Sequence, residues 1–248
     1  MNEELPHRLS WEPGDVPMSE RFGDTFYSRH DGRAEAAHVF LRGNGLPERF
    51  VERDRFVIAE LGFGTGLNFL ETWRQWNSVR QPGQVLSFVS FEMLPISPHD
   101  MARALACWGL LADLSGALLE RWKAAGQGDG QGIDRTLRWQ MDRQTQLCVV
   151  VGEAGGEVSR WNGAADAWFL DGFSPAKNPD MWQAELMARV FERTVPGGSF
   201  ATYTAAGWVR RNLLAAGFEI EKRPGYAGKR EMMAGVKPER LTLLPTLS

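Results

Sequence analysis

The chain has 248 residues, of which 43% are hydrophobic and 24% charged, the composition of a globular protein with one sizeable core. Its formal net charge of -3 excludes a general electrostatic attraction to nucleic acid, so an RNA partner would have to contact a local basic surface. Two cysteines without a CxxC pair, a polar amino terminus and no apolar run of roughly 18 residues predict a cytoplasmic protein that does not span a membrane. The four histidines show no metal-ligand spacing, and no metal is expected.

The chain is expected to divide into an extension, a core and a tail. Residues 1–55 contain turn-forming segments such as Glu12-Pro13-Gly14-Asp15 between short apolar runs, and we expect them to pack on the core as an N-terminal extension. Residues 56–240 are expected to form the catalytic domain, with a glycine-rich surface loop at 126–132. Residues 241–248 are expected to be a frayed tail.

Strand and helix signals alternate along the core. The apolar run 56–61 ends at glycines, as expected for a strand buried on both faces, and apolar residues then recur at helical spacing over 67–76. The same reasoning predicts strands at 85–91, 147–151, 167–170 and 199–204, and helices over 98–125, 181–193 and 208–216. Two short runs at 218–221 and 230–236 predict an antiparallel edge hairpin. The fold class is therefore α/β, with a mostly parallel seven-stranded sheet and an antiparallel C-terminal edge hairpin.

The first strand ends in a glycine turn, Gly62-Phe63-Gly64-Thr65-Gly66. Glycines allow positive φ and close backbone approach, and the following helix directs free N–H groups at an anionic group of a ligand. The GxGxG spacing, in place of GxGxxG, favours an adenosyl ligand over a dinucleotide, although a purely structural turn is the alternative. Glu92 ends the second strand, where a carboxylate can accept hydrogen bonds from both ribose hydroxyls. Glu153, after the strand 147–151, could accept the adenine amino group in the same way.

A polar loop with two prolines, 171–182, leaves the strand 167–170, and Asp171 is its first residue. Methyl transfer is an in-line displacement, so the enzyme must aim the lone pair of the nucleophile at the methyl carbon. Asp171 can do this for an amine by accepting one of its N–H groups, and it is the candidate proton acceptor. A carboxylate beside an ammonium group also stabilises the charged form, so the proton route remains open.

Four segments resemble the methyltransferase domain of the bifunctional tRNA enzyme MnmC: Glu60–Phe69, Asp166–Trp182, Ala201–Leu213 and Gly228–Met233. The resemblance extends from about Val16 to Val236. It implies a Rossmann-like class I fold that uses S-adenosyl-L-methionine to methylate wobble 5-aminomethyl-2-thiouridine in tRNA, giving 5-methylaminomethyl-2-thiouridine. It also implies that Glu60, Asn68 and Asp171 contribute to cofactor binding. Glu153 departs from the Asp expected at the adenine position in this family.

The resemblance implies tRNA, through its anticodon stem-loop, as the partner. Residues 205–240 contain eight Lys or Arg and four Glu, a plausible phosphate-contact patch, although such a charge run is usually only a solvated surface. The candidate tRNA contacts are Phe173 and Tyr203 for base stacking and Lys177, Arg210, Lys229 and Arg230 for phosphates.

In many relatives a FAD-dependent oxidoreductase domain follows and supplies the amine. Here the chain stops at Ser248, so either a FAD-dependent oxidoreductase is separately encoded, the amine arises by another route, or the chain is a fragment. The alternative functions are a non-catalytic tRNA-binding module on the same fold, another small-amine methyltransferase, an aminopropyltransferase, or a nucleotide-dependent oxidoreductase.

Overall fold

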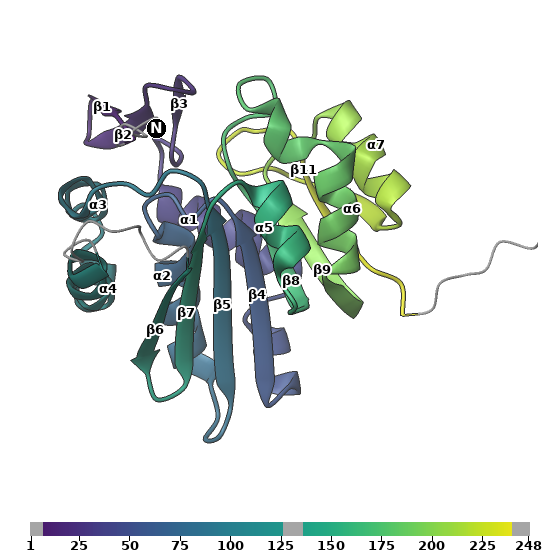
Figure 1. The fold of residues 1–248 in the computed structure, drawn as a ribbon, viewed down its shortest axis with the longest axis horizontal. Helices are drawn as coiled ribbons and strands as arrows, with labels where there is room; N and C mark the ends of the chain where they lie inside the picture. The colour runs from purple at the N-terminus through teal and green to yellow at the C-terminus, as the bar shows by residue number, and fades with distance from the viewer. Residues whose placement is uncertain (1–6, 126–135, 240–248) are drawn as a thin grey trace, which may run out of the picture.

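The computed structural model describes residues 7–125 and 136–239, so the predicted loop 126–132 and tail 241–248 lie outside the described residues. A main sheet has the strand order β10-β11-β9-β8-β4-β5-β7-β6 (Figure 1). Its strands are β4 (Arg55–Leu61), β5 (Val85–Glu92), β6 (Thr136–Asp142), β7 (Thr145–Val151), β8 (Ala165–Leu170), β9 (Thr194–Thr202), β10 (Glu219–Arg223) and β11 (Met232–Val236). Strands β4, β5, β7, β8 and β9 run parallel, and β10 and β11 form the predicted antiparallel edge hairpin.

One strand of this sheet was missed by the sequence analysis. Strand β6 pairs antiparallel with β7 at the opposite edge, so the described sheet has eight strands and not seven. Leu137, Trp139 and Met141 alternate along β6 and pack against the core on one face of the sheet. This period-two alternation was the available signal, but it covers a short segment directly after the glycine-rich run.

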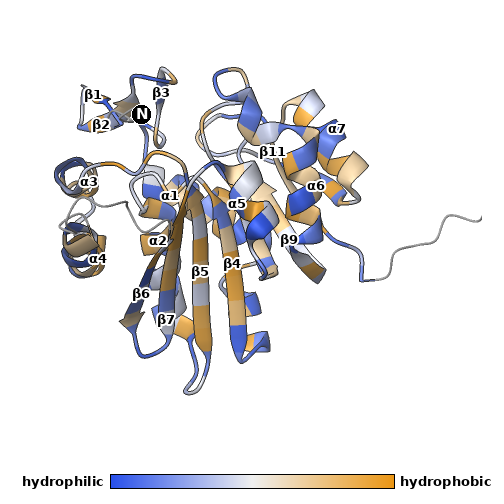
Figure 2. Ribbon diagram, viewed as in Figure 1, coloured by the Kyte–Doolittle hydropathy of each residue, from blue (hydrophilic) through white to orange (hydrophobic). Residues whose placement is uncertain are grey.

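Helices cover both faces of the sheet, as the apolar strands require. In β4, Phe56 and Ile58 face one core cluster while Ala59 and Leu61 face the other, and the central strands are largely apolar in Figure 2. The first cluster receives side chains from α2 (Leu67–Val79), α3 (Pro98–Leu105) and α4 (Ala112–Ala125), and the second from α5 (Ala154–Arg160), α6 (Ala184–Glu192) and α7 (Gly207–Ala216).

Two predicted helices are shorter than expected. The helix predicted over 98–125 is divided into α3 and α4 by the segment 106–111, which contains the short 3-10 turn η4 (Gly109–Leu111). A glycine at 109 weakens helix continuity at that point. The helix predicted over 181–193 begins as the 3-10 turn η5 (Pro179–Trp182) before α6. In the two described ranges, no helix has the length and apolar character needed to cross a membrane.

The N-terminal residues form a small antiparallel sheet followed by short helices. The sheet contains β1 (Leu9–Glu12), β2 (Val16–Ser19) and β3 (Asp24–Thr25), and it lies above one rim of the main sheet (Figure 1). The helical segments are α1 (Gly32–Ala36), η1 (Ala37–Leu41), η2 (Arg42–Asn44) and η3 (Glu48–Glu52). Val39, Leu46 and Phe50 belong to the same core cluster as α2, so this part of the chain packs directly on the main sheet.

The hairpin of β6 and β7 is fixed to α2 by Asp142. Its carboxylate accepts hydrogen bonds from the Gln144 N–H at 2.8 Å, the Trp73 indole at 2.9 Å and the Arg80 guanidinium at 2.8 Å. Partial burial acts to raise the pKa of Asp142, but these donors outweigh it and lower the pKa below its usual value.

We expect Asp142→Ala to lower the free energy of unfolding by about 2 kcal/mol at pH 7, because charge-assisted hydrogen bonds are lost. With a lowered folded-state pKa, the contribution is fully present above the ordinary value near 4 and is lost as the pH falls through the lowered value. The difference between variant and wild type in urea unfolding should therefore shrink as the pH falls below about 4. A difference that does not change with pH would contradict this assignment.

Candidate active site

A cleft of about 1040 Å³ opens at the carboxyl ends of the parallel strands. Leu61 pairs with Phe91 on one side and with Leu170 on the other, so the register places Gly62, Glu92 and Asp171 at the same rim. The cleft is lined by the following predicted site residues: Gly62, Gly64, Asn68, Glu92, Glu153, Asp171, Phe173, Lys177, Tyr203, Lys229 and Arg230. Glu60, Gly66 and Arg210 do not line it.

The glycine turn has the backbone conformation that the sequence predicts. Gly62, Gly64 and Gly66 all have positive φ, at 83°, 54° and 79°. A Cβ atom at Gly66 would lie 2.9 Å from the Leu118 side chain, so this position requires glycine for space as well as for φ. Helix α2 begins directly after Gly66 without a side-chain cap, which leaves N–H groups available for an anionic group.

Glu92 is joined to the glycine turn by a hydrogen bond. Its Oε2 accepts from the Gly64 N–H at 3.0 Å, and its Oε1 accepts from the Leu94 N–H at 2.7 Å. The carboxylate is therefore held in the cleft with lone pairs to spare, since each oxygen can accept a second hydrogen bond. Such a group suits the two hydroxyls of a ribose.

The Glu153 carboxylate already accepts hydrogen bonds within the protein. It is the N-cap of α5, and its two oxygens accept from the N–H groups of Gly155 and Gly156, both at 2.8 Å. Its side chain lines the cleft but is exposed. Any hydrogen bond to an adenine amino group would have to share a carboxylate that already caps a helix.

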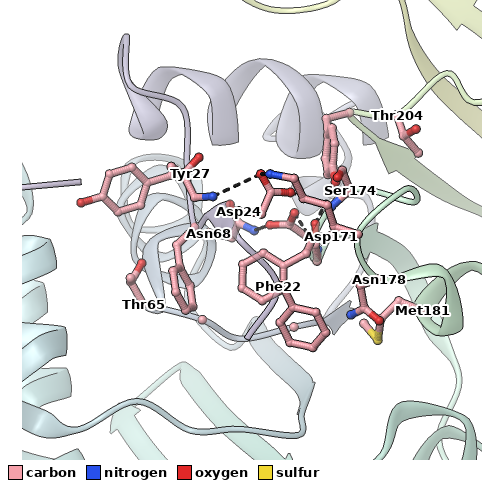
Figure 3. Close-up of a pocket in the computed structure, with 18 of the residues that line it drawn as sticks. Phe22, Asp24, Tyr27, Thr65, Asn68, Asp171, Ser174, Asn178, Met181 and Thr204 are labelled. Atoms are coloured by element: carbon pink, nitrogen blue, oxygen red, sulfur yellow. Dashed lines mark hydrogen bonds and ion pairs between the residues drawn. The ribbon is translucent and has the colours of Figure 1, made fainter. Parts of the chain in front are cut away.

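A buried polar chain lies beneath the turn. Glu60 is fully buried and accepts hydrogen bonds from Ser90 Oγ at 2.7 Å and from Asn68 Nδ2 at 3.0 Å. The Asn68 amide donates its other hydrogen to Asp171 Oδ2 at 2.7 Å, and Figure 3 shows Asn68 and Asp171 facing each other in the cleft. Burial raises the pKa of Glu60 well above its usual range. Glu60 therefore orients Asn68, and Asn68 orients Asp171.

Asp171 combines a fixed orientation with an altered acidity. Its Oδ1 accepts from the Gly172 N–H at 2.8 Å, and its side chain is only partly exposed. Burial, with a smaller contribution from the negative charge of Glu35, raises the pKa of Asp171 from 3.8 to about 7, despite the lowering effect of its hydrogen bonds and of the Lys229 charge. A carboxyl group with this pKa can both accept and return a proton at neutral pH.

Three contacts hold the loop after Asp171. The Tyr203 hydroxyl donates to the Gly172 carbonyl at 2.9 Å, the Trp182 indole donates to the Phe173 carbonyl at 3.1 Å, and the Asn212 amide donates to the Trp182 carbonyl at 2.9 Å. Burial, together with the negative Asp171, raises the pKa of Tyr203 well above its usual range, so its hydroxyl remains a donor. These contacts fix the loop that follows Asp171 and thereby the position of the Asp171 carboxyl group.

The small N-terminal sheet forms a roof over this loop, and sequence reasoning missed its contribution to the site. Phe22 stacks on Phe173 with ring centres 4.7 Å apart, and Phe26 contacts the same ring edge-on at 5.2 Å. Asp24 accepts from the Ser174 N–H at 2.9 Å and pairs with Lys177 at 3.2 Å (Figure 3 shows Phe22 and Asp24). The only sequence signal was the extension of the family resemblance back to Val16.

Several residues predicted to contact tRNA have partners within the protein. The Phe173 ring is covered by Phe22 and Phe26, and Lys177 pairs with Asp24. Lys229 lies over the Tyr203 ring at 4.9 Å and forms an ion pair with Glu35 at 2.7 Å. The stacking faces predicted at Phe173 and Tyr203 are thus already in contact with other side chains. Arg210 and Arg230 are both exposed, and of the two only Arg230 lines the cleft.

The described residues contain no group of three or more His, Cys, Asp or Glu side chains placed to hold a metal ion. What they do contain is a parallel sheet whose first strand ends in a glycine turn, with carboxylates after the neighbouring strands. This combination defines a Rossmann-like nucleotide-cofactor enzyme of the methyltransferase type.

Comparison with known proteins identifies the family. A family model described as S-adenosyl-L-methionine-dependent methyltransferase matches residues 115–238, half of the chain. The chain belongs to this family, and S-adenosyl-L-methionine is its cofactor. The uncapped start of α2, the glycine turn and the free lone pairs of Glu92 fit the carboxylate and ribose of that cofactor.

Curated relatives match almost the whole chain. The tRNA 5-methylaminomethyl-2-thiouridine biosynthesis bifunctional protein MnmC of Chromohalobacter salexigens is 44% identical over 236 residues, covering 93% of this chain and 33% of the relative. The protein of the same name from Caulobacter vibrioides is 45% identical over 239 residues, covering 96% of this chain and 39% of the relative. The chain therefore spans between a third and two fifths of the length of these relatives.

Solved structures support the fold. MNMC2 from Aquifex aeolicus matches with a TM-score of 0.71 at 23% identity, covering 98% of this chain and 74% of that chain. A spermidine synthase in complex with the transition state analogue AdoDATO matches with a TM-score of 0.51 at 11% identity, covering 94% of this chain and 73% of that chain. At these identities, the two matches show the shared Rossmann-like architecture.

Proposed function

We propose that this protein methylates the 5-aminomethyl group of wobble 5-aminomethyl-2-thiouridine in tRNA, giving 5-methylaminomethyl-2-thiouridine. The observation that carries the proposal is Asp171, a carboxyl group with a pKa of about 7 held beside the cofactor turn. The relatives are named for biosynthesis of a nucleoside that carries one N-methyl group, which is the bond that such a site would form.

In this proposal the chain's residues divide between cofactor and acceptor. The cofactor supplies an electrophilic methyl group on a sulfonium. Gly62, Gly64 and the N–H groups at the start of α2 would hold the cofactor's carboxylate, Glu92 would hold its ribose, and Glu153, while capping α5, would accept from its adenine amino group. Asp171 takes a proton from the acceptor ammonium and holds the resulting amine with its lone pair toward the methyl group.

The tRNA contact is proposed at the mouth of the cleft. Arg210, Arg211 and Arg230 are exposed, and Arg230 also lines the cleft, so these cations could meet the phosphates of an anticodon stem-loop. A base flipped into the cleft would approach Asp171 beneath the N-terminal roof. A tRNA substrate also implies a cytoplasmic location. The relatives are named as bifunctional proteins, and we propose that a FAD-dependent oxidoreductase supplies the amine.

The deciding experiment uses two tRNA preparations that differ at one group. The purified chain is incubated with methyl-labelled S-adenosyl-L-methionine and with tRNA carrying either the 5-aminomethyl or the 5-carboxymethylaminomethyl wobble uridine. Transfer only to the first preparation is expected, with the label in the wobble nucleoside by mass spectrometry. Cofactor binding without transfer to either tRNA would reject this acceptor.

A further inference from the structure

A second charged pair lines the cleft beside Asp171. Lys229 Nζ lies 2.7 Å from Glu35 Oε1, and Glu35 Oε2 also accepts from the Ser28 N–H at 3.1 Å. The Glu35 side chain is only 12% exposed, and both Glu35 and Lys229 line the cleft. Glu35 belongs to α1 and Lys229 to the loop between β10 and β11, so the pair joins segments 194 residues apart.

Tyr203 and Gly172 connect this pair to Asp171. The Lys229 ammonium lies over the Tyr203 ring, the Tyr203 hydroxyl donates to the Gly172 carbonyl, and the Gly172 N–H donates to Asp171 Oδ1. Burial is the main reason for the raised pKa of Asp171. Beyond burial, the charge of Glu35 raises this pKa and the charge of Lys229 lowers it.

Other titratable or charged groups surround Asp171 from each neighbouring element: Glu60 on β4, Glu92 on β5, Tyr203 after β9, and the Asp24–Lys177 pair between roof and loop. Burial raises the pKa of both Glu60 and Tyr203 well above the usual range. Asp24 and Lys177 carry opposite charges and pair with each other. The charges of Glu35 and Lys229 act on the pKa of Asp171 in opposite directions: Glu35 raises it and Lys229 lowers it.

We propose that Glu35 and Lys229 are positioning residues for methyl transfer, which keep the electrostatic environment of Asp171 balanced so that it can exchange a proton with the acceptor amine. This inference rests on the proposed function. In the step, the N–H bond of the acceptor ammonium breaks and an O–H bond forms on Asp171, so a cation and a carboxylate become an amine and a carboxylic acid. An unbalanced charge next to Asp171 would favour one side of this exchange.

The ion pair with Glu35 also bears on whether Lys229 contacts tRNA phosphates. An ammonium group has three donors, and one of those of Lys229 is used by Glu35. In this proposal the phosphate contacts fall to the exposed arginines, while Lys229 acts on Asp171. This separates residues for tRNA affinity from residues for proton exchange.

The test measures the titration of Asp171 directly, without an acceptor. Aspartate is labelled with ¹³C at the side-chain carboxyl, and the signal lost in Asp171→Asn identifies the residue. Glu35→Gln is expected to lower the titration midpoint of Asp171 by about one pH unit, and Lys229→Met to raise it by about one unit. The double variant Glu35→Gln/Lys229→Met should return to within a few tenths of a unit of wild type.

Lys222→Met is the matched control. Lys222 lies on the same hairpin and pairs with Glu231 at 2.7 Å, but unlike Lys229 it does not line the cleft. Its loss should leave the Asp171 midpoint unchanged. Midpoints that move in the same direction in both single variants, or that move equally in Lys222→Met, would overturn the inference. The Lys229 side chain is 48% exposed, so its variant should fold even if Glu35→Gln does not.

The titration and the methyl-transfer assay fail independently. If wild type transfers no methyl to the aminomethyl tRNA but the midpoints shift as expected, the acceptor is wrong and the electrostatic coupling stands. If wild type is active and the midpoints do not shift, the inference about Glu35 and Lys229 is wrong and the function stands.

Discussion

Replacing Asp171 by Asn is expected to lower the single-turnover rate of methyl transfer by about 10²- to 10⁴-fold, because Asn cannot accept the proton of the acceptor ammonium. Cofactor binding should be largely retained, since the glycine turn and Glu92 are unchanged and asparagine keeps a polar side chain at the position of Asp171. The measurement is rapid-quench transfer at saturating tRNA, with cofactor affinity from calorimetry. Asp113→Asn, an exposed aspartate on α4 outside the cleft, serves as the control and should transfer at the wild-type rate. A rate above about a tenth of wild type would contradict the role of Asp171.

The same substitution should change how stability depends on pH. In wild type, the folded-state pKa of Asp171 is about 7 against an ordinary 3.8, so protonated Asp171 contributes stability that is fully present below about pH 4. This contribution is lost as the pH rises through about 7. The asparagine amide of Asp171→Asn would not titrate, so between pH 5 and pH 8 the variant should gain stability relative to wild type. Thermal unfolding across this range measures the difference.

Glu92→Ala is expected to weaken S-adenosyl-L-methionine binding by about 10- to 100-fold, since about 1.5–3 kcal/mol is typical for a hydrogen bond to a charged group. The change would remove the proposed ribose acceptor and also the partner of the Gly64 N–H. Calorimetric titration of the cofactor measures the loss directly. S-adenosylhomocysteine should lose affinity by a similar factor, because it carries the same ribose.

The control for this loss is Glu192→Ala on α6, which removes a carboxylate whose partner is Arg189 and which lies outside the cleft lining. It should bind the cofactor with wild-type affinity. If Glu92→Ala bound the cofactor as tightly as this control, Glu92 would have no role in holding the ribose. The glycine turn would then have to account for the affinity without it.

The residues at the rim of the main sheet could be predicted from the sequence because the patterns that mark them are local. Each central strand is a short apolar run, and the polar residue that follows it must appear at the same edge in a parallel sheet. This placed the glycine turn, Glu92 and Asp171 together before any pairing was known. The register of Leu61 with Phe91 and Leu170 confirms that placement in space.

The N-terminal roof and the Glu35–Lys229 ion pair could not be predicted in this way. Phe22 and Asp24 reach the loop after Asp171 through contacts across about 150 residues, and no local period encodes such a contact. Lys229 belongs to a segment rich in Lys and Arg, which predicts a solvated surface or a phosphate patch. Its actual partner, Glu35, depends on how the C-terminal hairpin meets α1, and that is decided by tertiary packing.

The position of the roof has a consequence for how the protein is made. Ribosomes produce β1 to β3 first, but their partners, Phe173 and Ser174, emerge only after two thirds of the chain has been synthesised. The contacts between this small sheet and the loop after Asp171 can therefore form only after that loop has been synthesised. A nascent chain arrested before Asp171 would expose the aromatic underside of the roof, where a chaperone could bind it.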